Sequence, residues 1–242
     1  MIAATARAIE KRFRALHNPE RARVVQGFFK SKPGQHGAGD RFLGLSVPQV
    51  RQVGRELRDL PLAEIDALLA SPWHEVRLLA VILLANRYAK ADDQTRDAIY
   101  TLYLRRTDRI NNWDLVDVSA AQIVGAHLLH RSRTPLQQLA SSPRLWERRI
   151  AIIATHYFIV SGQFEDSLLL SERLLGDRED LIHKAVGWML REVGKQSVSA
   201  LTGFLDKHAG AMPRTALRYA IERLTPAQRQ RYMAVPRRPT RR

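Results

Sequence analysis

Apolar residues recur at helical spacing along almost the whole chain, and this pattern constrains the fold more than any other feature. One such run begins at Val76 and continues through Leu79, Ala80, Leu83 and Leu84. Spacings of three and four residues place side chains on one face of a helix. Alternating patterns rich in Val, Ile and Thr, which predict strands, are hard to find. The sequence therefore predicts an all-α protein.

Short breaks in this pattern mark where the predicted helices begin. They contain Ser, Asn, Asp or Pro, residue types that favour the N-cap or the first turn of a helix. The five clearest breaks are Ser71-Pro72, Asn111-Asn112, Ser142-Pro143, Gly176-Asp177 and Met212-Pro213. We expect a helix to begin shortly after each of them.

Three segments share a basic residue that is followed three positions later by a small one, which indicates an internal repeat. The basic residues are Arg77, Arg148 and Lys184, and the intervals between them are 71 and 36 residues. The longer interval is close to two copies of a period near 36. The intermediate copy is expected where Asn112-Trp113-Asp114 opens a new helical pattern, and Arg214 belongs to a shorter last copy.

A period in the upper thirties that is built from helix pairs predicts an α-solenoid of HEAT-like helical repeats, in which equivalent helices line one concave face. We expect residues 1–228 to form a single domain of this kind. After Glu222 the chain has no acidic residue, and residues 229–242 are expected to form a flexible, Arg-rich tail. The arginines of this end are Arg223, Arg229, Arg231, Arg237, Arg238, Arg241 and Arg242.

The charge of the chain points to a polyanionic partner. Its 39 Lys and Arg residues outnumber 24 Asp and Glu residues, which gives a formal net charge of +15. A nucleic acid is the first hypothesis, and a protein that is merely basic is the alternative. The absence of Cys excludes disulfides, thiolate zinc sites and Cys nucleophiles. Because no stretch approaches 18 uncharged apolar residues, we expect a cytoplasmic protein with no membrane partner, nucleoid-associated in a bacterium.

The longest irregular segment is residues 30–44, which contain four Gly. Such a loop can cradle a phosphate with its backbone N–H groups, but this one lacks the spacing and the Lys-Ser/Thr ending of a P-loop. A plain surface loop is the favoured interpretation.

Four residues stand out as candidates for a site. Trp113 and Asp117 are four residues apart and so share a helix face. Trp188 lies four residues after the repeat position Lys184, as Asp117 lies four residues after Trp113. In this register Asp117 and Trp188 therefore occupy equivalent places in two repeats. Arg149 follows the repeat position between them. Together these residues are expected to converge on one wall of the concave surface.

Each candidate also has a structural interpretation. Trp113 and Trp188 are large apolar residues of the kind usually found in a core. Asp117 can pair with a neighbouring arginine or be a solvated carboxylate near a helix N-terminus. Arg149 is one of many arginines. Only the coincidence of all four in the repeat pattern favours a functional site.

Three segments resemble the alkylpurine DNA glycosylases of the AlkD type, a family built of HEAT-like repeats. They are NWDLVD from Asn112, LWERRIAII from Leu145 and KAVGWMLRE from Lys184. The last is the most specific, and the resemblance extends from about Ala8 to about Arg223. It implies that Asp117 is the catalytic carboxylate. It also implies that the two tryptophans hold the backbone and sugar of the damaged nucleotide. The residues expected to bind substrate or DNA are Trp113, Arg148, Arg149, Lys184 and Trp188.

The chemistry of such a site can be stated from general principles. Alkylation at N3 or N7 makes a purine cationic and a good leaving group, as in 3-methyladenine and 7-methylguanine. The glycosidic bond then breaks toward a sugar oxocarbenium ion. Asp117 can stabilise that cation and orient the attacking water, while indole faces stabilise positive charge by cation–π interaction. The chain has no motif for a lysine Schiff base, so we expect a monofunctional glycosylase that does not cleave the strand, although Lys184 and Lys195 leave strand cleavage open. It is expected to act as a monomer on double-stranded DNA.

No cofactor and no metal are expected. His127 and His130 have a spacing that can chelate a metal, but no HExxH motif, no Cys and no nearby acid cluster completes a site, so helix-surface or packing histidines are the favoured interpretation. Two other functions remain open: a noncatalytic protein that binds damaged or branched DNA, and a protein-interaction scaffold, the commonest use of helical solenoids. The high positive charge favours either DNA-binding function over the scaffold.

Overall fold

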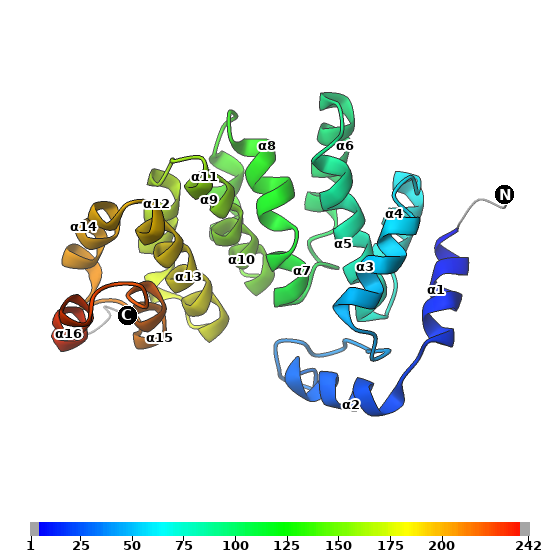
Figure 1. Cartoon of the computed structure of the whole chain (residues 1–242), viewed down its shortest axis with the longest axis horizontal. Helices are drawn as coiled ribbons and strands as arrows, with labels where there is room; N and C mark the ends of the chain where they lie inside the picture. Colours follow the sequence, from blue (N-terminus) through cyan, green and yellow to red (C-terminus); the bar gives the residue numbers. More distant parts are fainter. Residues whose placement is uncertain (1–4, 238–242) are drawn as a thin grey trace. The chain divides into compact units, whose positions relative to one another are not determined.

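The computed structural model describes residues 5–237, which form helices joined by turns and loops (Figure 1). Within this range there is no strand, only an isolated bridge between Arg41 and Trp73. The predicted all-α fold is therefore confirmed. None of the described helices is long and apolar enough to cross a lipid bilayer.

The chain divides into two compact units, Met1–Ile123 and Val124–Arg242. The helices of the first unit are α1 (Ala6–Ala15), α2 (Pro19–Phe28), α3 (Val47–Glu56), α4 (Leu62–Leu69), α5 (His74–Tyr88), α6 (Asp93–Arg105) and α7 (Trp113–Asp117). A π-helical turn, Ala121–Gly125, follows. The helices of the second unit are α8 (Ala126–Leu128), α9 (Thr134–Ala140), α10 (Leu145–Ala154), α11 (His156–Val160), α12 (Glu165–Arg173), α13 (Asp180–Gln196), α14 (Val198–His208), α15 (Arg214–Ala220) and α16 (Pro226–Ala234), with a 3₁₀ turn at Leu174–Gly176. That residues 1–228 form a single domain stays a prediction.

The predicted helix starts are confirmed. Helices α5, α7, α10, α13 and α15 each begin within four residues of one of the five breaks. At α7, for example, the side chain of Asn112 accepts a hydrogen bond from the backbone N–H of Trp113. This cap satisfies an N–H group that has no partner inside the helix. At three other breaks the side chains of Ser71, Ser142 and Asp177 accept a hydrogen bond from the backbone N–H two residues later, just before the helix begins.

Helix α5 is the core of the first unit. It packs against α3, α4, α6 and α7, and its residues are buried from His74 to Ala85. A helix that is apolar on all sides is typical of a buried position. The exceptions are three charged or polar residues in its first turn, His74, Glu75 and Arg77, which are also buried. Their side chains therefore need partners inside the protein.

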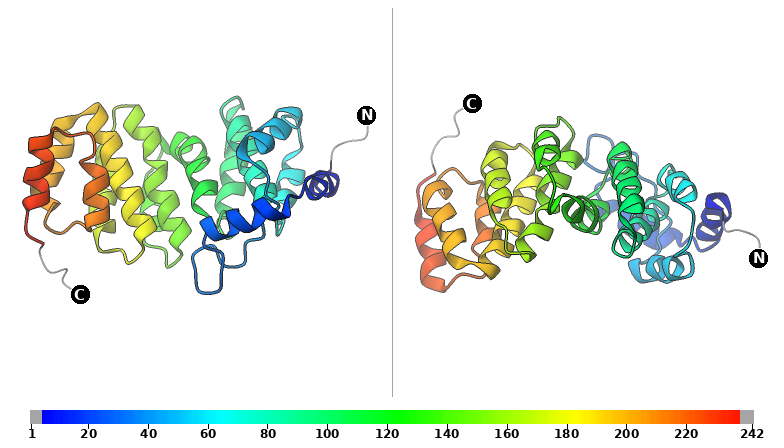
Figure 2. Two further views of the ribbon diagram at one scale, coloured as in Figure 1. Left: turned by 60° about the horizontal axis from the view of Figure 1, so that its bottom comes forward. Right: turned by 90° about the horizontal axis from the view of Figure 1, so that it is seen from above.

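Helix α13 has the same role in the second unit, where it packs against α10, α14 and α15 (Figure 2). Its Gly187 lies where the neighbouring helix approaches most closely. A Cβ atom at this position would lie 2.5 Å from the carbonyl oxygen of Ala216 and 2.5 Å from the Cβ of Tyr219 in α15. Ala80 and Ala151, the small residues of the other two segments, are fully buried. The small residue thus allows close packing of neighbouring helices.

A recurring hydrogen bond defines the register of the repeats. Arg77, Arg148 and His183 each donate a side-chain hydrogen bond to the main-chain carbonyl six residues earlier, at 3.1, 3.0 and 2.7 Å. In each case the bond ties the first turn of the helix to the break before it. The predicted register, which matched Lys184 with Arg148, is therefore wrong by one residue, because His183 performs this function in α13.

The C-terminal end differs from the prediction. Thr225 and Gln228 form a capping box at the start of α16, and Tyr232 is buried with its hydroxyl group 2.9 Å from a carboxylate oxygen of Asp206. Residues 229–234 are thus part of a packed helix, and the predicted flexible tail does not begin at residue 229. The rest of that predicted tail, from residue 238, lies outside the described residues.

Candidate active site

Helix α7 carries two of the candidate residues of the first unit. Leu115 and Val116 are fully buried and fix the helix to the core. Trp113 and Asp117, one turn apart, are both half-buried. Both candidates therefore lie at the boundary between core and solvent, where a side chain can be held by the protein and still reach a ligand.

Asp117 lines a cleft of 1470 Å³ in the first unit. The walls come from α3, α5, the start of α6 and the end of α7. The charged residues of the lining are Arg51, Arg55, Arg58, Arg87 and Lys90 on the basic side and Asp59, Asp92 and Asp117 on the acidic side. The cleft therefore has more cations than carboxylates.

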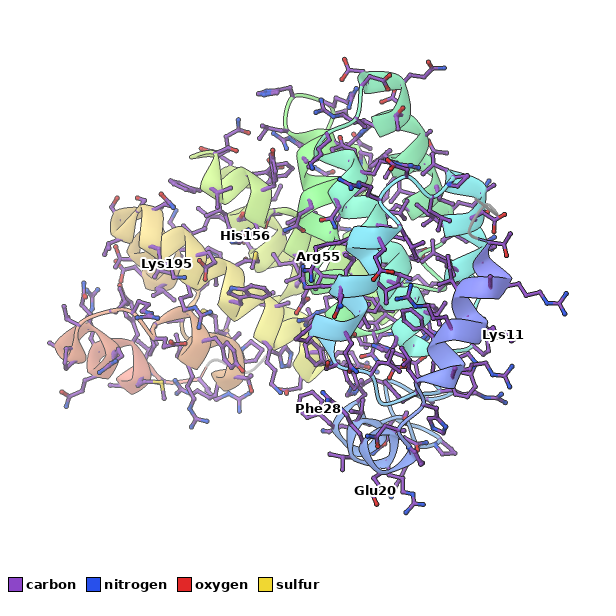
Figure 3. The ribbon with its side chains drawn as sticks, turned by 45° about the vertical axis from the view of Figure 1, so that its right-hand side comes forward. Lys11, Glu20, Phe28, Arg55, His156 and Lys195 are labelled. Carbon is purple, nitrogen blue, oxygen red and sulfur yellow. The ribbon has the colours of Figure 1, made fainter. Side chains whose placement is uncertain are left out.

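Three exposed cations of this cleft form no salt bridge in the described residues. Arg51 and Arg55 lie one turn apart on α3, and Lys90 follows the end of α5; all three are exposed (Figure 3 labels Arg55). Cations that are not neutralised within the protein attract anions such as phosphates.

Trp113 belongs to an aromatic cluster. Its ring stacks on Phe29 with centroids 5.2 Å apart and an interplanar angle of 13°, and Phe29 stacks in turn on the buried Phe42. The ring of Phe28 contacts Trp113 edge-on at 5.9 Å. One indole face is therefore covered by Phe29, so the structural interpretation of Trp113 is partly correct, and the residue remains half-exposed.

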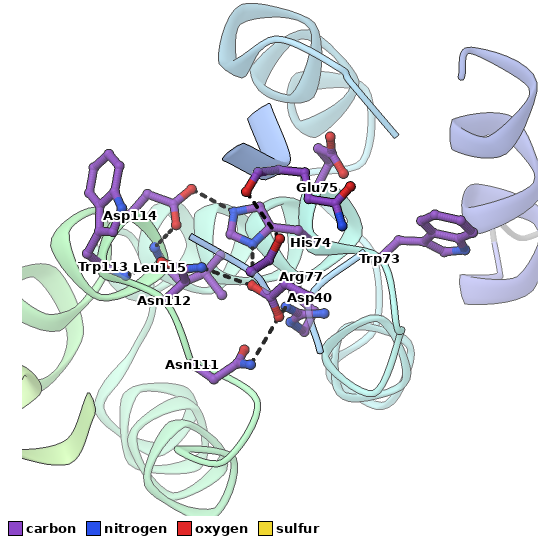
Figure 4. A network of polar contacts seen from close by, with 12 residues as sticks. Asp40, Trp73, His74, Glu75, Arg77, Asn111, Asn112, Trp113, Asp114 and Leu115 are labelled. Carbon is purple, nitrogen blue, oxygen red and sulfur yellow. Dashed lines mark hydrogen bonds and ion pairs between the residues drawn. The ribbon is translucent and has the colours of Figure 1, made fainter. Parts of the chain in front are cut away.

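A buried network holds α7 in place (Figure 4). The imidazole of His74 lies between two carboxylates, with Nδ1 3.1 Å from Asp40 and Nε2 2.8 Å from Asp114. Arg77 and Asn112 donate further hydrogen bonds to Asp40, at 2.5 and 3.0 Å. Asp40 belongs to the irregular segment of residues 30–44, called here the glycine-rich loop. The network therefore connects this loop with the start of α5 and the start of α7.

The network is charged. Burial alone would lower the pKa of His74, but the charges and hydrogen bonds of Asp114 and Asp40 raise it to about 9. Burial would raise the pKa of Asp40, but the hydrogen bond from His74 and the charges of Arg77 and His74 lower it to about 2. At neutral pH a protonated imidazole thus lies between carboxylates and fixes Asp114, the residue after Trp113. Neither Asp40 nor His74 was predicted from the sequence.

The glycine-rich loop also binds a carboxylate of the protein itself. The backbone N–H groups of Leu43, Gly44 and Leu45 donate to the side chain of Glu75 at 2.8–3.3 Å. Loop residues 42–45 are buried, so this end of the loop is not the plain surface loop that was expected. These amides cradle an anion, as backbone N–H groups in such a loop can, but the anion is Glu75 rather than a phosphate.

Trp188 is half-buried on α13, in the second unit. Its indole Nε1 donates to Glu192 at 3.0 Å, and Lys195 donates to the same carboxylate at 2.7 Å. Burial would raise the pKa of Glu192, but these two hydrogen bonds and the charge of Lys195 lower it. Trp188 is therefore fixed by an ionised partner one turn away. The ring of His156 lies 6.3 Å from the indole, and burial lowers the pKa of this histidine.

The three basic candidates of the second unit are engaged with protein atoms. Arg149 is only 4% exposed and donates to a main-chain carbonyl of α13. Arg148 binds Asp177, with Nε 2.6 Å from the carboxylate. Lys184 forms a salt bridge with Asp180 at 2.9 Å and is the most accessible of the three. Their contact with DNA stays a prediction.

The predicted equivalence of Asp117 and Trp188 is wrong. Asp117 is the fifth residue of α7, whereas Trp188 is the ninth residue of α13. Trp113 and Asp117 belong to the first unit, and Arg149 and Trp188 belong to the second. The convergence of these residues on one wall stays a prediction.

His127 and His130 show no chelating arrangement. His127 is buried and contacts Arg131 at 3.1 Å, while His130 is exposed. Among residues 5–237 there is no group of three His, Asp or Glu side chains placed to hold a metal ion.

Comparison with known proteins identifies the family. A family model described as DNA alkylation repair enzyme matches residues 9–224. The fold is similar to that of a solved structure, a predicted DNA alkylation repair enzyme from Enterococcus faecalis, with a TM-score of 0.67 and 20% identity over 87% of this chain and 97% of that one. No curated protein sequence matches the chain. Because the family match spans most of the sequence, the chain belongs to the DNA alkylation repair enzyme family.

Proposed function

We propose that this protein is a monofunctional DNA glycosylase that hydrolyses the N-glycosidic bond of cationic alkylated purines in duplex DNA. Its family supports a role in DNA repair. The observation that carries the finer proposal is the position of Asp117, whose carboxylate lines a cleft with an excess of cations. The expected substrates are purines of the 3-methyladenine and 7-methylguanine type.

The unpaired cations of the cleft would bind the phosphates that flank the lesion. Arg51, Arg55 and Lys90 are exposed and form no salt bridge in the described residues. Each phosphate contact releases condensed counterions from the duplex, which supplies affinity that falls as salt rises. A large part of the binding energy is therefore independent of sequence, as a repair enzyme that scans DNA requires.

A carboxylate in such a cleft opposes phosphate binding, so it needs a separate reason to be there. Asp117 repels the DNA backbone but attracts the positive charge that develops on the sugar as the glycosidic bond breaks. The purine leaves as a neutral base because its cationic ring takes the bonding electron pair. A water molecule then adds to C1′ of the sugar, and its proton passes to Asp117 or to solvent.

The tryptophans would complete the environment of the sugar. Trp113 keeps part of its surface exposed although Phe29 covers one face. Trp188 is held by Glu192 in a fixed orientation. Electron-rich indole faces stabilise a nearby cation by about 0.5–2 kcal/mol. No cofactor takes part in this mechanism, and we expect a monomer to carry it out.

The direct test is release of 7-methylguanine from duplex DNA by the wild type and by Asp117→Asn. The substitution keeps the shape of the side chain and removes its charge. Excision should fall by at least about tenfold, which corresponds to roughly 1.4 kcal/mol of lost transition-state stabilisation. Binding to undamaged duplex should be unchanged or stronger. Asp59→Asn, at an exposed carboxylate of the same cleft, is the matched control and should leave excision unchanged.

Two outcomes would count against the proposal. If Asp117→Asn keeps full excision but loses DNA binding, Asp117 is structural. If the wild type binds duplex DNA and releases no alkylated base, the protein is a noncatalytic binder of damaged or branched DNA. The salt dependence of binding is a separate check, because an affinity that does not change between low and physiological salt would refute any DNA-binding function.

A further inference from the structure

Helix α2 is unusual because none of its residues is buried. Two apolar side chains one turn apart on this helix are strongly exposed, Val24 at 73% and Phe28 at 68% (Figure 3 labels Phe28). A single exposed apolar residue is ordinary on a protein surface. An exposed Phe that contacts a candidate site residue calls for an explanation.

Phe28 is the exposed end of the aromatic cluster around Trp113. Its ring meets Phe29 at 5.4 Å and Trp113 at 5.9 Å, both edge-on. Phe29 is buried and anchors the cluster to the core through Phe42. The exposed ring therefore contacts Trp113, which lies one turn of α7 before Asp117.

The position of Phe28 is fixed by the loop that follows it. The hydroxyl group of Ser31 donates to the carbonyl of Gln26 at 3.1 Å, and the N–H of Gly37 donates to the carbonyl of Lys30 at 3.2 Å. A Cβ atom at Gly37 would lie only 2.4 Å from the carbonyl oxygen of Phe29, so the loop packs closely on the end of α2. Phe28 is thus exposed on a supported element rather than on a loose end.

The charges around Phe28 select a nucleic acid as its partner. The basic residues of α2 and the start of the loop are exposed and form no salt bridge in the described part of the chain; they are Arg21, Arg23, Lys30 and Lys32. Glu20 is the single acidic residue of α2. An apolar surface of a partner protein would not be attracted by these positive charges. DNA binds cations through its phosphates and stacks its bases on aromatic side chains, so it fits both features.

We infer that Phe28 is a wedge residue that enters the base stack beside the alkylated nucleotide and holds the duplex in a bent form. Apolar side chains that insert at a base step unstack it and kink DNA by about 20–90°. Phe28 would stack on a base next to the lesion while Trp113 faces the sugar. This inference rests on the proposed function, because it assumes that the lesion lies at Trp113 and Asp117.

Affinity measurements on two duplexes test the wedge. One duplex carries a tetrahydrofuran abasic-site analogue, which cannot be excised and leaves a gap in the stack, and the other is undamaged. Stacking of one base on an aromatic ring contributes about 1–3 kcal/mol, so Phe28→Ala should weaken binding of the first duplex by roughly 5- to 150-fold. Binding of the undamaged duplex should stay nearly unchanged. Phe28→Trp should restore selective binding.

Val24→Ala is the matched control, since this apolar residue is similarly exposed on the same helix but has no aromatic ring that could stack on a base. It should bind both duplexes like the wild type. Fluorescence energy transfer between dyes at the duplex ends adds a second readout. The wild type should bend the abasic duplex, and Phe28→Ala should not. Thermal unfolding of all variants should match the wild type, because neither side chain is buried.

Equal weakening of both duplexes by Phe28→Ala, or no weakening and no change in bending, would overturn the wedge. Neither measurement uses excision, so the result is independent of the glycosylase test. Loss of excision in Asp117→Asn without any selective effect at Phe28 would leave the proposed function intact and refute the wedge alone. A selective effect at Phe28 in a protein that excises no base would support the wedge in a DNA-structure-binding protein.

Discussion

Replacement of His74 by Gln should make the protein less stable and less sensitive to alkaline pH. His74 is 2% exposed and lies between the carboxylates of Asp40 and Asp114. Its pKa is raised from 6.5 to about 9, and at about 1.4 kcal/mol per pH unit this corresponds to roughly 3 kcal/mol in favour of the folded state. Gln keeps some hydrogen bonds but removes the charge, which leaves two buried carboxylates without their shared cation.

The pH window follows from the direction of the shift. A group whose pKa is higher in the folded protein than in the unfolded chain stabilises the fold fully below the unfolded value, here about 6.5. This contribution is lost as the pH rises through about 9. The free energy of unfolding of the wild type should therefore fall across this interval. His74→Gln should start about 3 kcal/mol lower at the acidic end and show a much flatter profile.

Urea unfolding followed by circular dichroism from about pH 6 to about pH 9 measures both effects. His130→Gln is the control, because His130 is exposed and should leave the profile of the wild type unchanged. A wild-type stability that is constant or rises over this interval would refute the protonated state of His74. The same would follow if His74→Gln kept the slope of the wild type.

Two further predictions concern DNA binding and the tryptophan of the second unit. The double variant Arg51→Ala/Arg55→Ala should reduce the slope of log affinity against log salt by roughly 2, about 0.9 for each lost phosphate contact. Arg12→Ala is the control and should leave the slope unchanged, because Arg12 already binds Glu56 outside the cleft. Equal slopes in the two variants would refute the cleft as the phosphate site. Glu192→Ala should lower excision about fivefold, the effect of losing one hydrogen bond of roughly 1 kcal/mol. Glu192→Gln keeps an acceptor for the Trp188 indole and should therefore restore most of the excision rate. Equal losses in both variants would show that the charge of Glu192 matters rather than the orientation of Trp188.

The elements that local sequence controls could be predicted well. The Ser-Pro pairs at Ser71 and Ser142 are local turn signals, and both serine hydroxyl groups accept a hydrogen bond from the backbone N–H two residues later, just before α5 and α10 begin. The repeat period was also visible, but its register was not. A basic residue in the first turn of a helix marks the repeat in the sequence. Which first-turn side chain reaches the main-chain carbonyl six residues earlier depends on how the break before the helix folds. For this reason Lys184 was chosen in place of its neighbour His183.

The support of the candidate site could not be predicted from local pattern. Asp40 lies 34 residues before His74, and Asp114 lies 40 residues after it. Each residue alone is compatible with a surface position, and only the packing of three elements shows that they neutralise one another in the core. The same applies to Phe28, whose contact with Trp113 joins residues 85 positions apart and leaves no periodic signal.

The bond between Glu75 and the glycine-rich loop separates that loop into two parts under different evolutionary constraint. The base, at Leu43 to Leu45, is tied to a buried carboxylate, so the backbone path there must be kept. Gly44 adds to this constraint, since its φ is +79° and a Cβ atom would lie 2.5 Å from the carbonyl oxygen of Asn18. The tip, residues 32–35, is exposed and carries no such bond. Insertions and substitutions can therefore accumulate at the tip and diversify the surface around α2 without disturbing the core on which the loop is mounted.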